Sequence, residues 1–292
     1  MKKVLIAGAT GYLGRYLIKE AKNQGYWVRA LARKACKLDD LKDSMDEICE
    51  AEITKPNTLK GICDGIDDVI SSIGITRQKD GLTYMDVDYQ ANRNLLQEAR
   101  KSSVKKFIYV SVLNGADLRY LEICDAKEKF VEELKASGLE YCIIRPNGFF
   151  SDMADFFEMA KKGRIFLFGK GQLKTNPIHG KDLATVCVDA SNKGTKEVFV
   201  GGPETLTHQE IALSAFDVLG SKPKITYIPE WMRVSVLKLL KMFTGSRTYG
   251  PLEFFMTVMA IDMVAPEYGK YTLKEHFVSL KNKDACIHRS FS

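Results

Sequence analysis

The stretch Lys3-Val-Leu-Ile-Ala-Gly8-Ala-Thr-Gly11-Tyr-Leu-Gly14 decides the fold of this 292-residue chain. Its short apolar run leads directly into glycines spaced G-x-x-G-x-x-G, and residues 15–21 continue with helical periodicity. A strand, a glycine turn and a helix in this order place the pyrophosphate of a dinucleotide at the helix N-terminus, where free backbone N–H groups and the helix dipole meet its charge. The stretch therefore predicts a dinucleotide-binding site, but it predicts no particular reaction.

The composition is that of an ordinary globular protein, with 45% hydrophobic and 27% charged residues. The net charge of +6 is scattered along the chain, so we expect no nucleic-acid partner and only a mild preference for anionic ligands. The seven cysteines form no C-x-x-C pair and have no histidines at metal spacing, which predicts free thiols in a reducing cytoplasm and no metal site. A strand that starts at residue 3 leaves no room for a signal peptide.

Strand and helix signals alternate through the first two hundred residues. The expected strands are 27–33, 67–74, 106–112, 141–146 and 197–200, and the expected helices are 91–99, 125–136 and 182–190. The almost continuous apolar run at 106–112 is typical of a parallel strand that is covered on both faces. This regular βαβ alternation predicts an α/β fold with a Rossmann-type, doubly wound parallel sheet.

The pattern loosens after residue 147, with a short strand expected at 163–169. It becomes mainly helical after residue 201, where Thr207–Glu210 and Thr272–Glu275 are capping boxes. We therefore expect an NAD(P)-binding domain of residues 1–148 plus about 175–200. Residues 149–174 and 201–292 are expected to form a small, mainly helical substrate-binding lobe.

Two apolar stretches of this lobe bear on membrane contact. Residues 254–265 are too few to span a bilayer, so no stable membrane insertion is predicted. Residues 231–243 form an amphipathic helix, and the interpretation we favour is that it covers a core or a pocket. Contact with a membrane or a partner is the alternative.

The end of the second strand predicts the cofactor preference. An acidic residue there binds the ribose 2′-hydroxyl, whereas an arginine accommodates a 2′-phosphate. Arg33 and Lys34 occupy this position, and no carboxylate follows before Asp39. NADP(H) is therefore favoured over NAD(H), since a guanidinium binds phosphate bidentately; alternatively, Arg33 is a solvated charge or stacks on adenine. The residues expected to contact the cofactor are Gly8, Thr10, Gly11, Tyr12, Leu13, Gly14, Arg33, Lys34, Glu52, Ser72, Gly74, Pro146 and Asn147.

Four further motifs accompany the glycine turn. They are Val110-Ser-Val-Leu-Asn-Gly115, the Lys127…Glu132…Ser137-Gly-Leu139 helix and turn, Ile144-Arg-Pro146, and Asn176-Pro-Ile-His-Gly-Lys-Asp-Leu-Ala184. With them, the chain from residue 3 to about residue 205 resembles the short-chain dehydrogenase/reductase superfamily. Within that superfamily it is similar to the atypical, NmrA-like and divinyl-reductase-like branch. The C-terminal lobe resembles the family only in general layout.

The resemblance implies a catalytic pair that this sequence carries only in part. Enzymes of the superfamily usually have a Tyr-x-x-x-Lys pair, whose lysine binds the nicotinamide ribose and whose tyrosine moves the proton. Lys127 aligns with the lysine, and Ile123 occupies the tyrosine position. Tyr120 is a weaker acid–base candidate. Ser111 aligns near the active-site serine or threonine, or else it satisfies local backbone groups.

The resemblance implies an NADP(H)-dependent oxidoreductase that transfers hydride to a small carbonyl or activated C=C substrate. Lys127 would bind the ribose or act as the acid–base group, with Ser111 near the nicotinamide. Partial burial beside a cationic nicotinamide would lower the pKa of Lys127 towards neutrality. The alternatives are a non-catalytic NADP(H)-binding redox sensor and an NAD(P)-dependent sugar epimerase or dehydratase. Lys127 could also be an ordinary surface lysine.

A substrate pocket is expected beyond the carboxyl ends of the strands. Its candidate lining residues are Asn114, Phe149, Phe150, Met153 and Trp231, with 254–259 from the C-terminal lobe. Their aromatic and thioether side chains predict an apolar or planar small-molecule substrate, although the same residues could serve to pack the lobe. His179 follows a proline turn and is interpreted as structural. The sequence leaves the oligomeric state open.

Overall fold

The computed structural model describes residues 1–76, 78 and 81–290, and its contacts divide the chain into two compact units. Unit 1 consists of Met1–Pro146 and Leu183–Phe199. Unit 2 consists of Asn147–Asp182 and Val200–Ser292. Residues 175–182, which we expected in the NAD(P)-binding domain, belong to unit 2, where the Asn176 amide donates to the carbonyl oxygen of Ala265 at 2.7 Å.

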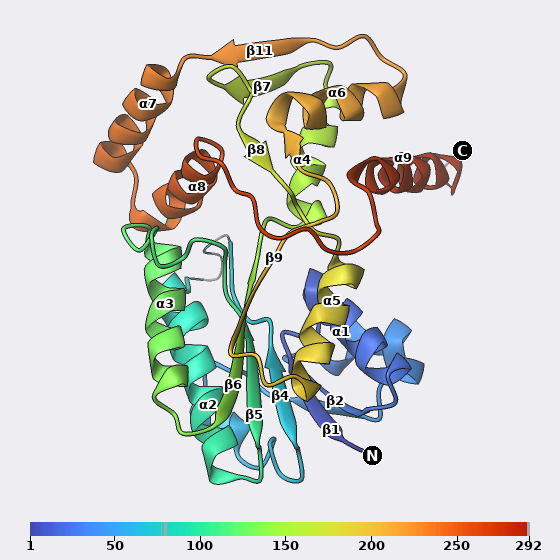
Figure 1. Cartoon of the computed structure of the whole chain (residues 1–292), viewed down its shortest axis with the longest axis vertical. Coiled ribbons are helices and arrows are strands. Elements are labelled where there is room, and N and C mark those ends of the chain that lie inside the picture. The colour runs from blue at the N-terminus through green and yellow to red at the C-terminus, as the bar shows by residue number, and fades with distance from the viewer. Residues whose placement is uncertain (77, 79–80, 291–292) are drawn as a thin grey trace. The chain divides into compact units, whose positions relative to one another are not determined.

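Unit 1 is built on a seven-stranded sheet in the order β3-β2-β1-β4-β5-β6-β9 (Figure 1). Its strands are β1 (Lys3–Ala7), β2 (Trp27–Ala32), β3 (Glu47–Glu50), β4 (Asp68–Ser71), β5 (Lys106–Val110), β6 (Glu140–Pro146) and β9 (Glu197–Val200). The paired strands from β3 to β6 are parallel, and Ala7 lies between Leu31 of β2 and Ser71 of β4. The predicted Rossmann-type sheet is confirmed.

Helices cover both faces of this sheet, α2 and α3 on one face and α1 and α5 on the other (Figure 1). They are α1 (Tyr12–Asn23), α2 (Asn92–Lys101), α3 (Glu122–Lys135) and α5 (Gly180–Asp189). Shorter helical segments are η1 (Ala35–Ser44), η2 (Pro56–Leu59), η4 (Ala190–Asn192) and the π-helix η3 (Met85–Ala91). Each long helix turns an apolar stripe to the sheet; α1, for example, buries Leu13, Leu17, Ile18 and Ala21.

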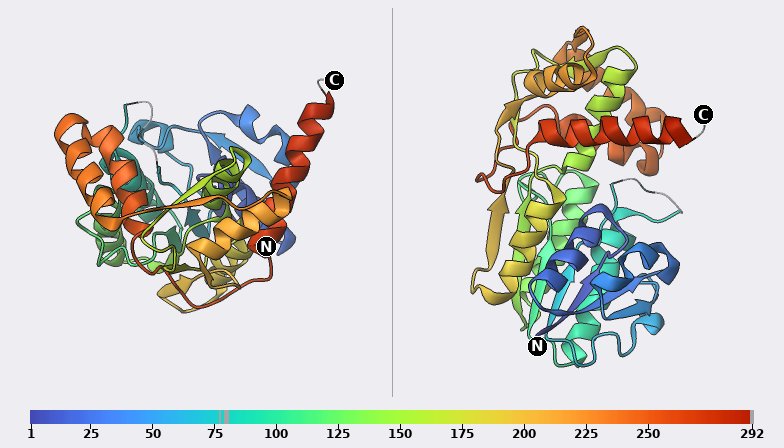
Figure 2. Two further views of the ribbon diagram at one scale, coloured as in Figure 1. Left: turned by 90° about the horizontal axis from the view of Figure 1, so that it is seen from above. Right: turned by 90° about the vertical axis from the view of Figure 1, so that its right-hand side faces the viewer.

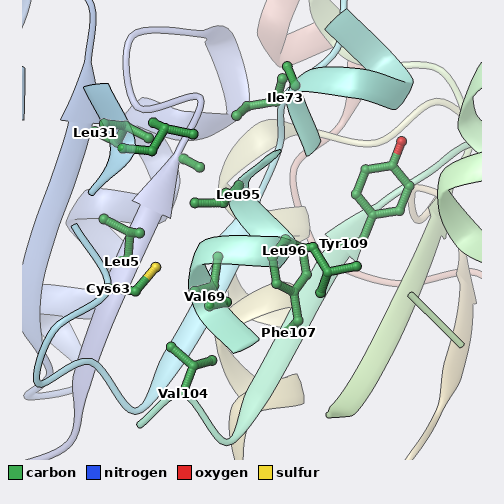
Figure 3. Packing of buried hydrophobic residues seen from close by; sticks show 14 of the residues in the cluster. Leu5, Leu31, Cys63, Val69, Ile73, Leu95, Leu96, Val104, Phe107 and Tyr109 are labelled. Carbon is green, nitrogen blue, oxygen red and sulfur yellow. The ribbon is translucent and has the colours of Figure 1, made fainter. Parts of the chain in front are cut away.

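The core of unit 1 surrounds the central strands (Figure 3). Every residue of β5 is buried, as its continuous apolar run predicts. The one charged residue of the strand, Lys106, is tolerated because its Nζ donates to the carbonyl oxygen of Ala190 at 2.7 Å. Strand β5, which we predicted to be covered on both faces, is therefore a central strand of the sheet.

Unit 2 combines helices with two small sheets. Its elements are α4 (Phe150–Lys161), β7 (Ile165–Phe168), β8 (Lys174–Thr175), β10 (Leu206–Thr207), α6 (His208–Leu219), β11 (Ile225–Ile228), α7 (Glu230–Phe243), α8 (Ser246–Val258) and α9 (Leu273–Ser290). Strand β7 pairs with β11 in parallel, and β8 pairs with β10 antiparallel. A second apolar core joins α4, α6 and α9, the last of which is the red helix in both views of Figure 2.

Several local predictions for the helices are tested by these elements. Both capping boxes form: Glu210 N–H donates to the Thr207 hydroxyl at 3.1 Å, and Glu275 N–H to the Thr272 hydroxyl at 3.3 Å. The helix expected at 125–136 begins three residues earlier, at Glu122. Leu121, with its extended backbone, is the N-cap residue, and the carboxylate of Glu122 stabilises the first turn by its interaction with the helix dipole. Within the residues described, no group of side chains could hold a metal ion, and six cysteines are free thiols.

The amphipathic helix at 231–243 does not fit the interpretation we favoured from sequence. It forms α7, but none of its residues is buried, so it does not cover a core. The side chains that it turns towards α8 are only half-buried. Among the described residues, no helix is long and apolar enough to cross a membrane.

A buried ion cluster ties α3, β6 and β9 together inside unit 1. The Arg145 guanidinium donates to both carboxylate oxygens of Glu128, at 2.6 and 2.9 Å, and to Glu197 at 2.5 Å. The side chains of Arg145 and Glu128 are 5% and 7% exposed, so each depends on the other for its charge to be tolerated. The hydrogen bonds of the cluster raise the pKa of Arg145 against the effect of burial, which keeps the guanidinium charged.

This cluster predicts a large effect of Arg145→Met on stability. The substitution leaves the carboxylate of Glu128 buried without its cationic partner, so we expect the free energy of unfolding to fall by about 3–5 kcal/mol in urea unfolding followed by circular dichroism. The control is Lys129→Met, which breaks the exposed pair with Asp125 on the same helix and should cost less than about 1 kcal/mol. Equal losses in the two variants would contradict the role of the cluster.

Candidate functional site

The turn between β1 and α1 has a shape that only glycine permits at two positions. Gly8 has a φ of +83°, a left-handed conformation, and its carbonyl oxygen accepts the Gly11 N–H at 2.9 Å. A Cβ atom on Gly14 would lie 2.0 Å from the carbonyl oxygen of Gly8. Helix α1 therefore packs directly on the turn, and no side chain at position 14 separates the backbone of the helix from the backbone of the turn.

The N-terminus of α1 is prepared for a negative charge. Its N-cap residue Gly11 supplies no side-chain hydrogen bond, and the first turn carries no acidic residue. Neither a side-chain cap nor a carboxylate therefore offsets the positive end of the helix dipole at this terminus. Thr10 and Gly11 are exposed, whereas Tyr12 is half-buried and Leu13 is buried. The cradle and the uncapped helix fit a dinucleotide pyrophosphate.

Positive charge follows the end of β2. Arg33 and Lys34 are both exposed. Of the carboxylates that follow, Glu50 accepts the N–H of Ala35 at 2.5 Å, and Glu52 pairs with Lys55 at 2.6 Å. The hydrogen bond from Lys55 lowers the pKa of Glu52, and attraction to Arg33 adds to the effect. Arg33 thus lies near Glu52, the other residue we expected beside the adenosine.

The end of β4 lies against the glycine turn. Ser72 N–H donates to the carbonyl oxygen of Ala7 at 3.0 Å, and a Cβ on Gly8 would lie 2.7 Å from the Ser72 hydroxyl oxygen. Gly74 follows two residues later. A Cβ there would lie 2.6 Å from Asp88 Oδ1 and 2.8 Å from Lys127 Nζ. The segment 72–74 therefore connects the glycine turn with a buried pair of charges.

Lys127 and Asp88 form that pair. Lys127 Nζ of α3 lies 2.8 Å from Asp88 Oδ1 of η3, and the side chains are 12% and 0% exposed. The second carboxylate oxygen of Asp88 accepts the N–H of Ile75 at 3.2 Å. The ammonium group also lies 5.7 Å from the centre of the Tyr109 ring. Lys127 is therefore not an ordinary surface lysine, which was the alternative interpretation of its sequence position.

The pair overturns our expectation for the pKa of Lys127. Burial works against the charged ammonium, but attraction to Asp88, together with the hydrogen bond between them, raises the pKa of Lys127 above its ordinary value. We had expected this pKa to fall towards neutrality. The error arose because Asp88 was not recognised as a partner. Lys127 is a fixed cation at neutral pH and a weak acid.

Tyr109 is the other group that the sequence reasoning missed. It lies on β5 and is fully buried, and burial raises the pKa of its phenol. Figure 3 shows its ring at the margin of the apolar cluster, with the hydroxyl directed away from the labelled side chains. Asp88 could have been found from the pattern, because it extends the buried stripe of Ala91, Leu95 and Ala99 back by one turn with an acid.

The remaining catalytic candidates are arranged differently from the superfamily's usual pair. Ile123 is buried in the first turn of α3. Tyr120, the weaker acid–base candidate, precedes that helix and is 67% exposed, so it does not share a helical face with Lys127. Ser111 is buried, and its hydroxyl donates to Glu128 at 3.4 Å. Its position near the nicotinamide stays a prediction, and its hydroxyl is coupled to the ion cluster around Arg145.

The candidate pocket residues fall into both units. Asn114, in unit 1, is half-buried and has a φ of +55°. Phe150 and Met153, in unit 2, belong to the apolar core together with Phe156 and Phe157, because they lie on the buried face of α4. These two residues therefore pack the unit, which was the other interpretation of their side chains. Phe149 is half-buried at the start of α4, and Trp231 is exposed on α7.

Two further predicted contacts adjoin the end of β6. Pro146 is the last residue of that strand. The Asn147 amide is buried and donates to Asn176 Oδ1 at 2.7 Å and to the carbonyl oxygen of Met263 at 2.5 Å, while its own oxygen accepts the Gly148 N–H at 2.7 Å. These bonds hold loops of unit 2 together. A cofactor contact by Asn147 stays a prediction.

Comparison with known proteins shows the family to which the chain belongs. The model of a family described as NAD(P)H-binding matches residues 8–193. Divinyl chlorophyllide a 8-vinyl-reductase of Arabidopsis thaliana is 28% identical over 92% of this chain and 72% of its own length. The photosystem II assembly factor Ycf39 of Synechocystis is 28% identical over 83% of this chain and 74% of its own.

Solved structures share the fold. AtPrR2, determined with NADP⁺ and (+)pinoresinol, superposes with a TM-score of 0.76 at 16% identity over 95% of this chain and 98% of its own. The NADPH-dependent quinone oxidoreductase QOR2 of Escherichia coli, determined with NADPH, gives a TM-score of 0.68 at 17% identity over 96% of this chain and 99% of its own. At these identities the likeness establishes the architecture.

The buried pair predicts a pH-dependent effect of Asp88→Asn on cofactor binding. The amide keeps an acceptor for Ile75 but removes the counter-charge, so the main influence that opposes burial is lost and the pKa of Lys127 falls. The wild-type ammonium stays charged between about pH 7 and 9, whereas the variant loses its charge as the pH rises through the lowered pKa. NADPH affinity, measured by fluorescence titration, should then weaken with rising pH in the variant more than in the wild type.

The matched control for this experiment is Asp125→Asn. It removes a carboxylate from the same helix that carries Lys127, but one that pairs with the half-buried Lys129 and Arg119. Its NADPH titrations should follow the wild-type pH profile. Parallel pH profiles for the wild type and Asp88→Asn would show that Lys127 keeps its charge without Asp88, and the assigned role would be wrong.

Proposed function

The chain belongs to the NAD(P)H-binding family, and we propose that it is an NADP(H)-dependent reductase acting on a planar, largely apolar substrate with an activated C=C bond or a carbonyl. The observation that carries the proposal is the buried Lys127–Asp88 pair, which abuts Gly74 beside the glycine turn. A charged pair that lies next to a dinucleotide cradle is a candidate for a functional site. The reductase among the similar proteins supports the same reaction class.

The residues of unit 1 suffice to hold a phosphorylated dinucleotide. Gly8, Gly11 and the first turn of α1 would hold the pyrophosphate, and Arg33 with Lys34 would hold the 2′-phosphate. Ser72 and Gly74 would line the ribose side. NADPH supplies the hydride when it is bound.

Lys127 acts in this proposal as a fixed positive charge. Its Nζ donates to ribose hydroxyls and stabilises negative charge that develops on the substrate. Since Asp88 holds the pKa of Lys127 high, the lysine is a weak proton donor, and the proton that completes the reduction comes from water or the substrate's own acidic group. Ser111, held by Glu128, would position the nicotinamide side of the site.

A second function is favoured by the side chain at position 123. The buried Ile123 occupies the place of the usual tyrosine, which fits a protein that binds NADP(H) and reports its redox state to a partner. The similarity to an assembly factor supports this alternative. A sugar epimerase or dehydratase is less well supported, because such enzymes generally need the tyrosine.

Arg33→Ala tests the cofactor preference. We expect the wild type to bind NADPH at least about tenfold more tightly than NADH, and the variant to lose most of this difference by weakening NADPH alone, since only NADPH carries the 2′-phosphate. The measurement is fluorescence titration with both cofactors. Lys42→Ala, which removes an exposed lysine paired with Asp39, is the control and should change neither affinity. Equal NADPH and NADH affinities in the wild type would show that Arg33 and Lys34 do not select for the 2′-phosphate.

The double variant Asp88→Asn/Lys127→Met tests turnover. Removing both charges avoids leaving either one buried alone, so the fold should be retained while the cation at the site is lost. NADPH consumption with a panel of quinones and α,β-unsaturated ketones should fall at least about a hundredfold in kcat/KM. Lys129→Met on the same helix is the control. Full activity in the double variant would discard the assigned role of Lys127.

A further inference from the structure

Helix α7 presents a broad apolar surface to solvent. Six of its seven large exposed apolar side chains fall in two adjacent rows along the helix, Trp231, Leu239 and Met242 in one row and Met232, Val236 and Phe243 in the other; the seventh, Val234, lies on the lysine side. Met242 and Phe243 are each 76% exposed and Trp231 is 67% exposed. We call these six residues the α7 apolar face. Such a cluster of large exposed side chains marks an interaction site.

The α7 apolar face is not the side by which the helix packs. The half-buried residues are Arg233, Leu237, Leu240 and Thr244, which recur at the spacing of a different face. That face contacts α8, where Arg233 donates to the carbonyl oxygen of Met256 at 3.4 Å. The helix is therefore held in unit 2 by one side while the α7 apolar face points elsewhere.

The charges of α7 have one sign next to the apolar face. Lys238 and Lys241 lie along one of its flanks and are both exposed. Between Trp231 and Phe243 the helix contains no acidic residue, and the carboxylate of Glu230 pairs with Arg233. Long lysine side chains at such a flank reach phosphate groups while their methylene stems cover apolar surface.

The length of the helix fixes how it could meet a bilayer. With 14 residues, α7 is about 21 Å long, which is shorter than the hydrocarbon core of about 30 Å. The lysines also prevent burial of its whole circumference. A helix of this kind lies in the interface plane, with its apolar face in the acyl region and its cations among the headgroups.

We propose that α7 docks this protein onto an anionic lipid membrane. The α7 apolar face enters the boundary between headgroups and acyl chains, Trp231 lies at headgroup depth, and Lys238 and Lys241 bind lipid phosphates. Charge complementarity selects lipid as the occupant, because the apolar face is bordered by cations and by no acid within the segment 231–243. The membrane would bring a reductase of apolar substrates to the phase in which such substrates dissolve.

The experiment is vesicle flotation of the full chain. Vesicles of phosphatidylcholine with phosphatidylglycerol should carry the protein, and vesicles of phosphatidylcholine alone should carry much less. Lys238→Gln/Lys241→Gln should lower the partition coefficient on anionic vesicles about 30-fold, and added salt should do the same to the wild type. Leu239→Glu/Phe243→Glu should abolish binding, since it places charges in the apolar face.

Exposed residues elsewhere give the controls. Leu213→Glu on α6 changes an apolar side chain that is 39% exposed and lies outside the α7 apolar face, and Lys60→Gln removes an exposed cation from unit 1. Neither should affect flotation. NADPH titration and circular dichroism on every variant should match the wild type, which separates this test from the test of the cofactor site.

Three outcomes would overturn the proposal. The first is no flotation of the wild type on anionic vesicles. The second is flotation that Leu239→Glu/Phe243→Glu leaves unchanged. The third is a dimer, measured by sedimentation velocity, that this double variant dissociates. The dimer would assign the α7 apolar face to a second copy of the chain.

Discussion

The close packing of α1 on the glycine turn is the constraint on which the nucleotide half of this protein depends. Gly14 lies where any Cβ would overlap the carbonyl oxygen of Gly8, so helix and turn share one backbone surface. That contact fixes where α1 begins, and it leaves the first-turn N–H groups without a side-chain cap at the carboxyl edge of the sheet. The register of β1 against β4 then brings Ser72 to the same place. The anion site that we propose at this place would consist of backbone groups.

Unit 1 contains two buried groups of charged side chains, and the two groups differ in how many partners each cation has. Arg145 is shared by Glu128 and Glu197, with bonds that use much of its guanidinium, and it joins three elements. Lys127 faces a single carboxylate beside Gly74. A compact ammonium with three donors and one partner retains capacity to bind a ligand. The chemistry of arginine and lysine thus distinguishes a cluster whose donors are largely used within the protein from the pair that we propose to be functional.

The sequence alone sufficed for features whose cause is local. The glycine spacing, the apolar run of β5 and the capping boxes at Thr207 and Thr272 each specify their own conformation, and the structure contains all of them. The state of Lys127 depends on Asp88, thirty-nine residues earlier, and no local pattern couples the two. Phe150 and Met153 were ambiguous because core packing and pocket lining require the same side chains. The charge state of Lys127 and the packing role of Phe150 and Met153 therefore depend on contacts with distant residues rather than on residue type.

The path of the chain through the sheet has a consequence for biosynthesis. Strand β6 ends at Pro146, and its neighbour β9 begins at Glu197; most of the residues between them, 147–182, belong to unit 2. A nascent chain that has emerged only as far as Pro146 has β6 as an open edge, and Arg145 then lacks Glu197. The sheet of unit 1 cannot be completed until the ribosome has translated residues 147–182 of unit 2. The two units are thus linked in the order of their synthesis, and a pause within residues 147–182 would prolong the exposure of that edge.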